Sequence, residues 1–115
     1  MSARTTDIHR YTELQIETAS QRRLICILHE QCVLQLRNAL REERSVRRPF
    51  LDKSQNILVI LQRALQLDDA TSRGLYHLYD YCYCRLESNE TAEIRNALRV
   101  LEVLSGTFGH LMKHP

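Results

Sequence analysis

Residues that interrupt α-helices are scarce in this chain. Its 115 residues include only two prolines and three glycines, and no stretch alternates apolar with polar residues for long enough to indicate a β-strand. Apolar residues recur instead at spacings that place them on one face of a helix. The sequence therefore predicts an all-α protein.

The helical pattern divides into segments joined by short connections. The predicted helices cover residues 19–44, 50–67, 70–88 and 91–112. Connections this short force neighbouring helices to run antiparallel. We expect an antiparallel up-down four-helix bundle, in which residues 18–115 form one domain and residues 1–17 form a partly flexible N-terminal arm.

Residues suited to helix starts precede these segments. Thr18 and Gln21 have the spacing of a capping box, in which a hydroxyl accepts a hydrogen bond from a free amide. Pro49 suits the first turn of the second helix, because it has no amide hydrogen to leave unpaired. Asp68 or Asp69 is expected to cap the third helix.

Advancing 100° per residue assigns one face of each helix to a shared core. The core residues predicted in this way, helix by helix, are Ile25, Leu28, Cys32, Leu36 and Ala39; Phe50, Ile57, Ile60, Leu61 and Ala64; Leu75, Leu78, Tyr79, Cys82 and Leu86; and Ile94, Ala97, Leu98, Leu101, Leu104 and Phe108.

Further apolar residues fall outside these core faces. Residues 24–28 contain no polar residue at all, so this turn of the first helix is apolar on every side. Several outward apolar residues on more than one helix indicate grooves for a partner. Wider packing or a homodimer would produce the same pattern. The residues predicted to bind a client peptide are Ile27, Leu34, Val59, Tyr76, Tyr83, Val100 and Val103.

The composition is that of a globular protein, with 43% hydrophobic and 26% charged residues. No apolar run approaches the roughly 20 residues that a membrane-spanning helix requires. The N-terminus has no hydrophobic segment of the signal-peptide kind. We expect a cytoplasmic protein without membrane insertion.

Basic residues crowd together between Arg37 and Arg48, although the formal net charge is only +2. Glu42 and Glu43 interrupt this run. A run of this kind is usually a solvated helix end and loop. A nucleic-acid-binding regulator that uses residues 37–48 is the alternative, and it predicts a salt-sensitive association with DNA or RNA.

Sequence motifs of catalysis or metal binding are missing. No Glu is followed three residues later by His, and there is no glycine-rich phosphate loop. Cys26, His29 and Cys32 fan out over about 120° of a helix, which suits a metal poorly. The four cysteines, which include Cys82 and Cys84, match no zinc or disulfide framework. We expect no enzymatic activity, no cofactor and no metal.

Three stretches of the chain carry a family resemblance. They read RYTELQIETASQRRLICILHEQCVLQLRNAL, DKSQNILVILQRALQLDD and LYHLYDYCYCRLESNE. Their order and spacing resemble the FliS family of flagellin export chaperones over roughly residues 10–90. The residues that match the family pattern are Tyr11, Ala19, Ser20, Leu24, Lys53, Ile57, Leu58, Leu67, Asp68, Leu78, Tyr79, Tyr81, Cys82, Arg85, Leu86 and Asn89.

The chain also departs from the family pattern. An acidic Asp-Gly pair is common near the middle of the first helix in the family, where this chain has His29, Glu30 and Gln31. A tryptophan is frequent near the end of the fourth helix, about where Phe108 stands.

The resemblance implies a helical bundle that binds and involves no chemical step. Members of the family hold the disordered C-terminal segment of flagellin, prevent its premature polymerisation and deliver it to the flagellar type III export apparatus. An export-gate component is a further implied partner. The family's N-terminal arm can cover the client groove, and Ile8, Tyr11 and Ile16 are spaced to anchor such a cover, although an untethered arm fits these residues as well. A weak homodimer through Tyr76, Tyr83 and the outward valines remains a further possibility.

Overall fold

The computed structural model describes the backbone of residues 7–113 and the side chains of residues 20–110. In this part of the chain there are helices and no strands, as predicted. They are α1 (Asp7–Arg41), the 3-10 turn η1 (Arg44–Val46), α2 (Arg48–Arg63), α3 (Ala70–Glu87) and α4 (Thr91–Lys113).

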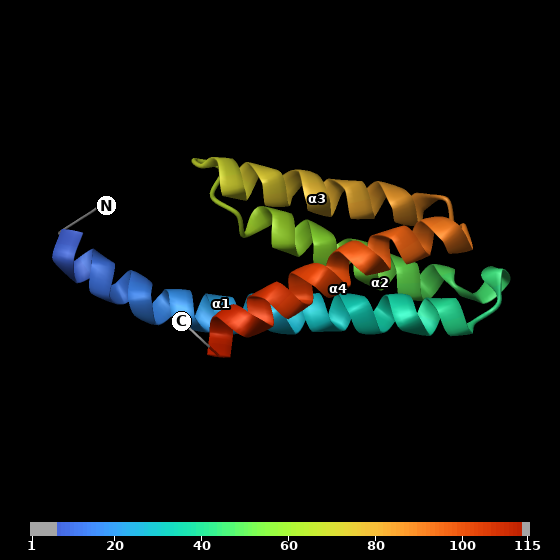
Figure 1. Cartoon of the computed structure of the whole chain (residues 1–115), viewed down its shortest axis with the longest axis horizontal. Helices are drawn as coiled ribbons and strands as arrows, with labels where there is room; N and C mark the ends of the chain where they lie inside the picture. Colours follow the sequence, from blue (N-terminus) through green and yellow to red (C-terminus); the bar gives the residue numbers. More distant parts are fainter. Residues whose placement is uncertain (1–6, 114–115) are drawn as a thin grey trace.

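Consecutive helices run antiparallel and enclose one core (Figure 1). α1 packs against α2 and α4, and α3 packs against the same two helices from the other side. This ring of contacts confirms the predicted antiparallel four-helix bundle.

Small side chains set the register between helices. Cys32 Sγ donates a hydrogen bond to the Ser54 carbonyl oxygen at 3.7 Å, and Ser54 Oγ donates to the Cys32 carbonyl oxygen at 3.3 Å. On the other side of the bundle, Cys82 Sγ lies 3.8 Å from the Ala97 carbonyl oxygen. Because these side chains are short, the helix backbones approach closely at both contacts.

The predicted core is confirmed for most of α1, α3 and α4, but part of it is wrong. Ile60 is 49% exposed, Leu78 is 39% exposed and Ala64 is also exposed. In α2 the core is filled instead by Leu51 and Leu58, which are fully buried. The error has a physical reason: the inner face of α2 also carries the polar residues Ser54 and Gln55, which a count of apolar residues assigns to the outside.

Helix α1 begins at Asp7, twelve residues before the predicted start at residue 19. The prediction of a cap at Thr18 is therefore wrong, because the helical backbone continues through that residue. No proline or glycine lies between residues 7 and 18, so nothing in the backbone chemistry stops the helix there. Figure 1 shows the N-terminal part of α1 extending beyond the other helices. The side chains of Ile8, Tyr11 and Ile16 lie outside the described residues.

The start of α3 has the predicted cap. Asp69 is the N-cap residue of α3, and its carboxylate accepts a hydrogen bond from the Ser72 amide at 2.7 Å. This hydrogen bond is the main reason why the pKa of the Asp69 carboxyl lies below its usual value.

Arg47, a member of the basic run, is buried and joins three parts of the bundle. Its Nε donates to the carbonyl oxygens of Ala39 (3.1 Å) and Glu42 (3.2 Å) at the end of α1. Its Nη1 donates to Thr91 Oγ1 at 2.7 Å, at the first residue of α4. The guanidinium thus links the end of α1 to the first residue of α4.

The tie at Arg47 gives a stability prediction. Arg47→Met keeps much of the side-chain volume but removes all three hydrogen bonds, so we expect the free energy of unfolding to fall by about 2 kcal/mol. Urea unfolding followed by circular dichroism measures this loss. Arg63→Met, at an exposed arginine of α2, is the matched control and should change stability far less. Equal losses in the two variants would contradict the structural role of Arg47.

Candidate functional site

The seven residues predicted to bind a client differ in exposure. Those that are exposed are Ile27 (45%), Leu34 (44%), Tyr76 (37%) and Val103 (68%). Val59, Tyr83 and Val100 are half-buried, and the last two pack against the core. The structure brings two of the seven, Val100 and Val103, together at one hollow.

This hollow lies between α3 and α4 and has a volume of about 340 Å³. It is lined by Leu78 from α3 and by Arg99, Val100, Val103 and Leu104 from α4. Apart from Arg99, each of these side chains is apolar. Leu78 was predicted to lie in the core. It is exposed because it lines this hollow, which is open to solvent.

The divergence of α3 and α4 produces the hollow. The two helices are joined by a short turn, and near it Cys82 and Ala97 hold them close together. Figure 1 shows the helices spreading apart toward their other ends. Glycines lie along the spreading part, and a Cβ at Gly74 or Gly106 would have no neighbouring atom within 4 Å.

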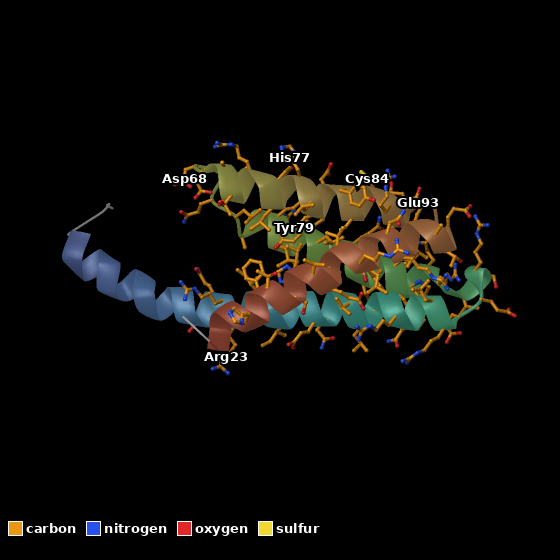
Figure 2. All side chains as sticks on the ribbon, viewed as in Figure 1. Arg23, Asp68, His77, Tyr79, Cys84 and Glu93 are labelled. Carbon is orange, nitrogen blue, oxygen red and sulfur yellow. The ribbon has the colours of Figure 1, made fainter. Side chains whose placement is uncertain are left out.

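Below the spread ends, three aromatic rings connect α1, α3 and α4. His29 Nε2 and the Tyr79 hydroxyl share a hydrogen bond of 2.9 Å. The His29 ring also stacks on Phe108, with ring centroids 4.9 Å apart. Figure 2 shows Tyr79 on the inner side of α3, whereas His77 on the same helix points away from the bundle. His29 and Phe108 are two positions at which the chain departs from the family pattern, and they contact each other.

The environment of His29 favours its neutral form. Its side chain is fully buried, and burial lowers the pKa of the imidazole below its usual value. Its Nδ1 atom has no hydrogen-bond partner of adequate geometry among the described residues. Burial likewise raises the pKa of the Tyr79 hydroxyl above its usual value. Both groups therefore remain uncharged near pH 7, as a core contact requires.

A second apolar surface lies on the outer side of α1. Leu24 is 53% exposed and shares a helix face with Ile27 and Leu34, at spacings of three and seven residues. The contact between Cys32 and Ser54 sets the antiparallel register, so the exposed Ile60 of α2 lies level with residue 26 of α1. The sequence analysis named neither Leu24 nor Ile60 among the outward apolar residues, although Leu24 begins the apolar run at residues 24–28.

Several arginines of the basic run make contacts within the protein. Besides Arg47, Arg48 donates to the carboxylate of Asp52 (2.8 Å) and to the Leu86 carbonyl oxygen (3.2 Å). Arg44 forms an ion pair with Glu90. These contacts give the arginines a structural role at the junction of α1, α2 and α3, whether or not they contact another molecule.

The cysteines occupy unlike environments. Cys32 and Cys82 are fully buried, and burial raises the pKa of each thiol to about 12. They are therefore protonated at neutral pH. Within residues 20–110 there is no group of three or more His, Cys, Asp or Glu side chains that could hold a metal ion. No helix in the described part of the chain is both long and apolar enough to cross a membrane.

The chain was compared with protein families and with curated proteins. A family model with the description "Flagellar protein FliS" matches residues 4–115, which is nearly the whole chain. A search of curated protein sequences found no match.

The burial of His29 gives a pH prediction. The pKa of His29 is lower in the folded protein than in the unfolded chain. On acidification the unfolded chain therefore binds a proton at this histidine before the folded protein does. Between about pH 7.5 and about pH 5.5 the free energy of unfolding should fall, by up to about 1.4 kcal/mol per pH unit below the usual histidine pKa.

Two glutamine variants separate His29 from the other histidines. His29→Gln should be less stable at pH 7.5 but should lose stability less steeply on acidification, because glutamine does not titrate. His77→Gln changes an exposed histidine and should keep the slope of the wild type. Urea titrations at a series of pH values measure both slopes. An unchanged slope in His29→Gln would show that the protons bind elsewhere.

Proposed function

This chain belongs to the FliS family of flagellar chaperones, and we propose that it binds the disordered C-terminal segment of flagellin in the bacterial cytoplasm. Binding would prevent premature polymerisation of flagellin and deliver it to the flagellar type III export apparatus. The action is one of binding and release, without a chemical step.

The observation that supports this proposal most directly is the apolar hollow between α3 and α4. Val103, at its edge, is 68% exposed, the highest exposure among the large apolar side chains of residues 20–110. Most of the surface of this valine is therefore left in contact with water by the fold of its own chain. An amphipathic helix that lays its apolar side into the hollow would remove Val103, Val100 and Leu78 from water. This is the helix-in-groove mode of peptide recognition.

One hollow is too small to bind a disordered segment tightly. Full burial of a valine or leucine contributes at most about 1.5–3 kcal/mol, and the residues here are already partly buried. A segment that orders on binding loses about 2–5 kcal/mol of that gain. We therefore propose that the segment also covers the outer face of α1, where Leu24, Ile27 and Leu34 offer a second set of contacts. A chain spanning both surfaces would wrap around the bundle.

Val103→Asp tests the hollow. A carboxylate at this position would face the apolar side of the client, so the dissociation constant for the C-terminal flagellin segment should rise at least about tenfold. Stability and helix content should stay close to the wild type, because Val103 is exposed in the free protein. Isothermal titration calorimetry with the purified segment, together with circular dichroism, measures both.

The matched control is Val46→Asp, the same substitution at a 48%-exposed valine in η1, which does not line the hollow. It should leave the affinity unchanged. Wild-type affinity in Val103→Asp would contradict the proposed binding surface.

Ile27→Asp tests the outer face of α1 separately. We expect a weaker complex with normal helicity, because Ile27 is 45% exposed and a polar side chain is tolerated there. The same calorimetric titration gives the affinity. An unchanged dissociation constant would remove this face from the client surface but leave the hollow in place.

A further inference from the structure

Arg99 is the single charged side chain in the lining of the hollow. It lies beside Val100 and shares the hollow with Val103 and Leu104. Its long apolar stem can form part of the wall while the guanidinium stays at the rim. The edge of an otherwise apolar binding surface thus carries one positive charge.

The guanidinium of Arg99 is oriented by a neutral partner. Its Nη1 donates to Asn96 Oδ1 at 2.9 Å, and Asn96 Nδ2 donates to Glu93 Oε1 at 3.4 Å. Glu93 is in turn paired with Arg85 at 3.6 Å. These contacts follow α4 toward the end at which it is joined to α3. The carboxylate of Glu93 forms its ion pair with Arg85 and forms none with Arg99.

Two other arginines at helix contacts have a carboxylate of their own. Arg37 pairs with Glu102 at 2.7 Å, and Arg44 pairs with Glu90. Among the side chains of residues 20–110, no carboxylate lies within ion-pair distance of Arg99. The guanidinium is therefore available to an incoming negative charge, while its single bond to Asn96 restricts its orientation.

We propose that the segment seated in the α3–α4 hollow is an amphipathic helix that places a carboxylate against Arg99, next to the apolar side chains that fill the hollow. This inference rests on the proposed function and specifies the chemistry of the client at that site. Seating the helix would exclude water from one side of the guanidinium, which strengthens a hydrogen-bonded ion pair relative to an exposed one. Arg99 then selects for an acidic residue beside the apolar anchors, and Asn96 acts as its positioning residue.

Arg99→Gln is the first test, with Arg95→Gln as its matched control. Both remove one positive charge from exposed positions of α4, but Arg95 does not line the hollow. The dissociation constant for the purified C-terminal flagellin segment should rise about fivefold in Arg99→Gln and change little in Arg95→Gln. Raising the NaCl concentration from about 0.05 M to about 0.5 M should weaken wild-type binding more than binding to Arg99→Gln. Equal effects of the two substitutions would overturn the inference.

A charge swap identifies the partner. In the background of Arg99→Glu, each acidic residue of the segment is changed to lysine in turn, and one position should restore most of the lost affinity. A purely structural role of Arg99 would give no such rescue, and rescue at no position or equally at all positions would overturn the inference.

Val103→Asp separates the two proposals. Loss of binding in Val103→Asp with wild-type affinity in Arg99→Gln would reject the carboxylate contact and keep the hollow. Wild-type affinity in both variants would reject the hollow as the client site, and the inference with it.

Discussion

The close approach of α3 and α4 at Cys82 and Ala97 is the constraint on which the candidate site depends. Two short side chains and a short turn hold these helices together at one end, so any angle between them opens a gap at the other. The side chains of His29, Tyr79 and Phe108 fill this gap on the side that faces the core. On the solvent side it stays open as an apolar hollow.

Charged groups in the bundle divide into those that hold the fold and those that face outward. Arg47 donates hydrogen bonds to backbone carbonyl and hydroxyl oxygens at the helix ends, and Arg44 and Arg48 form ion pairs with carboxylates. Part of the basic run thus makes contacts within the bundle, and of these arginines only Arg47 is buried. Arg99, which no sequence pattern distinguishes, lines the apolar hollow, and no carboxylate of residues 20–110 lies within ion-pair distance of it. Local charge density in the sequence therefore does not identify the arginine that lines the hollow.

Periodicity predicted the core faces of α1, α3 and α4 well because these faces are mostly apolar, as at Leu36, Tyr79 and Leu101, although it placed the start of α1 twelve residues too late. It failed for α2, where Ser54 and Gln55 lie inside. Their burial is possible because Ser54 pairs with the Cys32 carbonyl oxygen and Gln55 with the Tyr83 carbonyl oxygen, at 3.1 Å for the latter. Whether a polar residue of a helix can be buried thus depends on hydrogen-bond partners from other helices. Of the predicted client residues, Val100 and Val103 line the hollow. Tyr83 is partly buried and packs against the core.

The sequence by itself determined the helices, their antiparallel order and the family, because these follow from local spacing, scarce helix breakers and ordered motifs. Only the tertiary structure decided the phase of α2, the burial of Arg47 and the position of the hollow. These features depend on the angle between helices and on contacts between residues far apart in the chain. A repeat of three or four residues records which way a side chain points from its own helix, and it does not record whether a neighbouring helix is there to cover it.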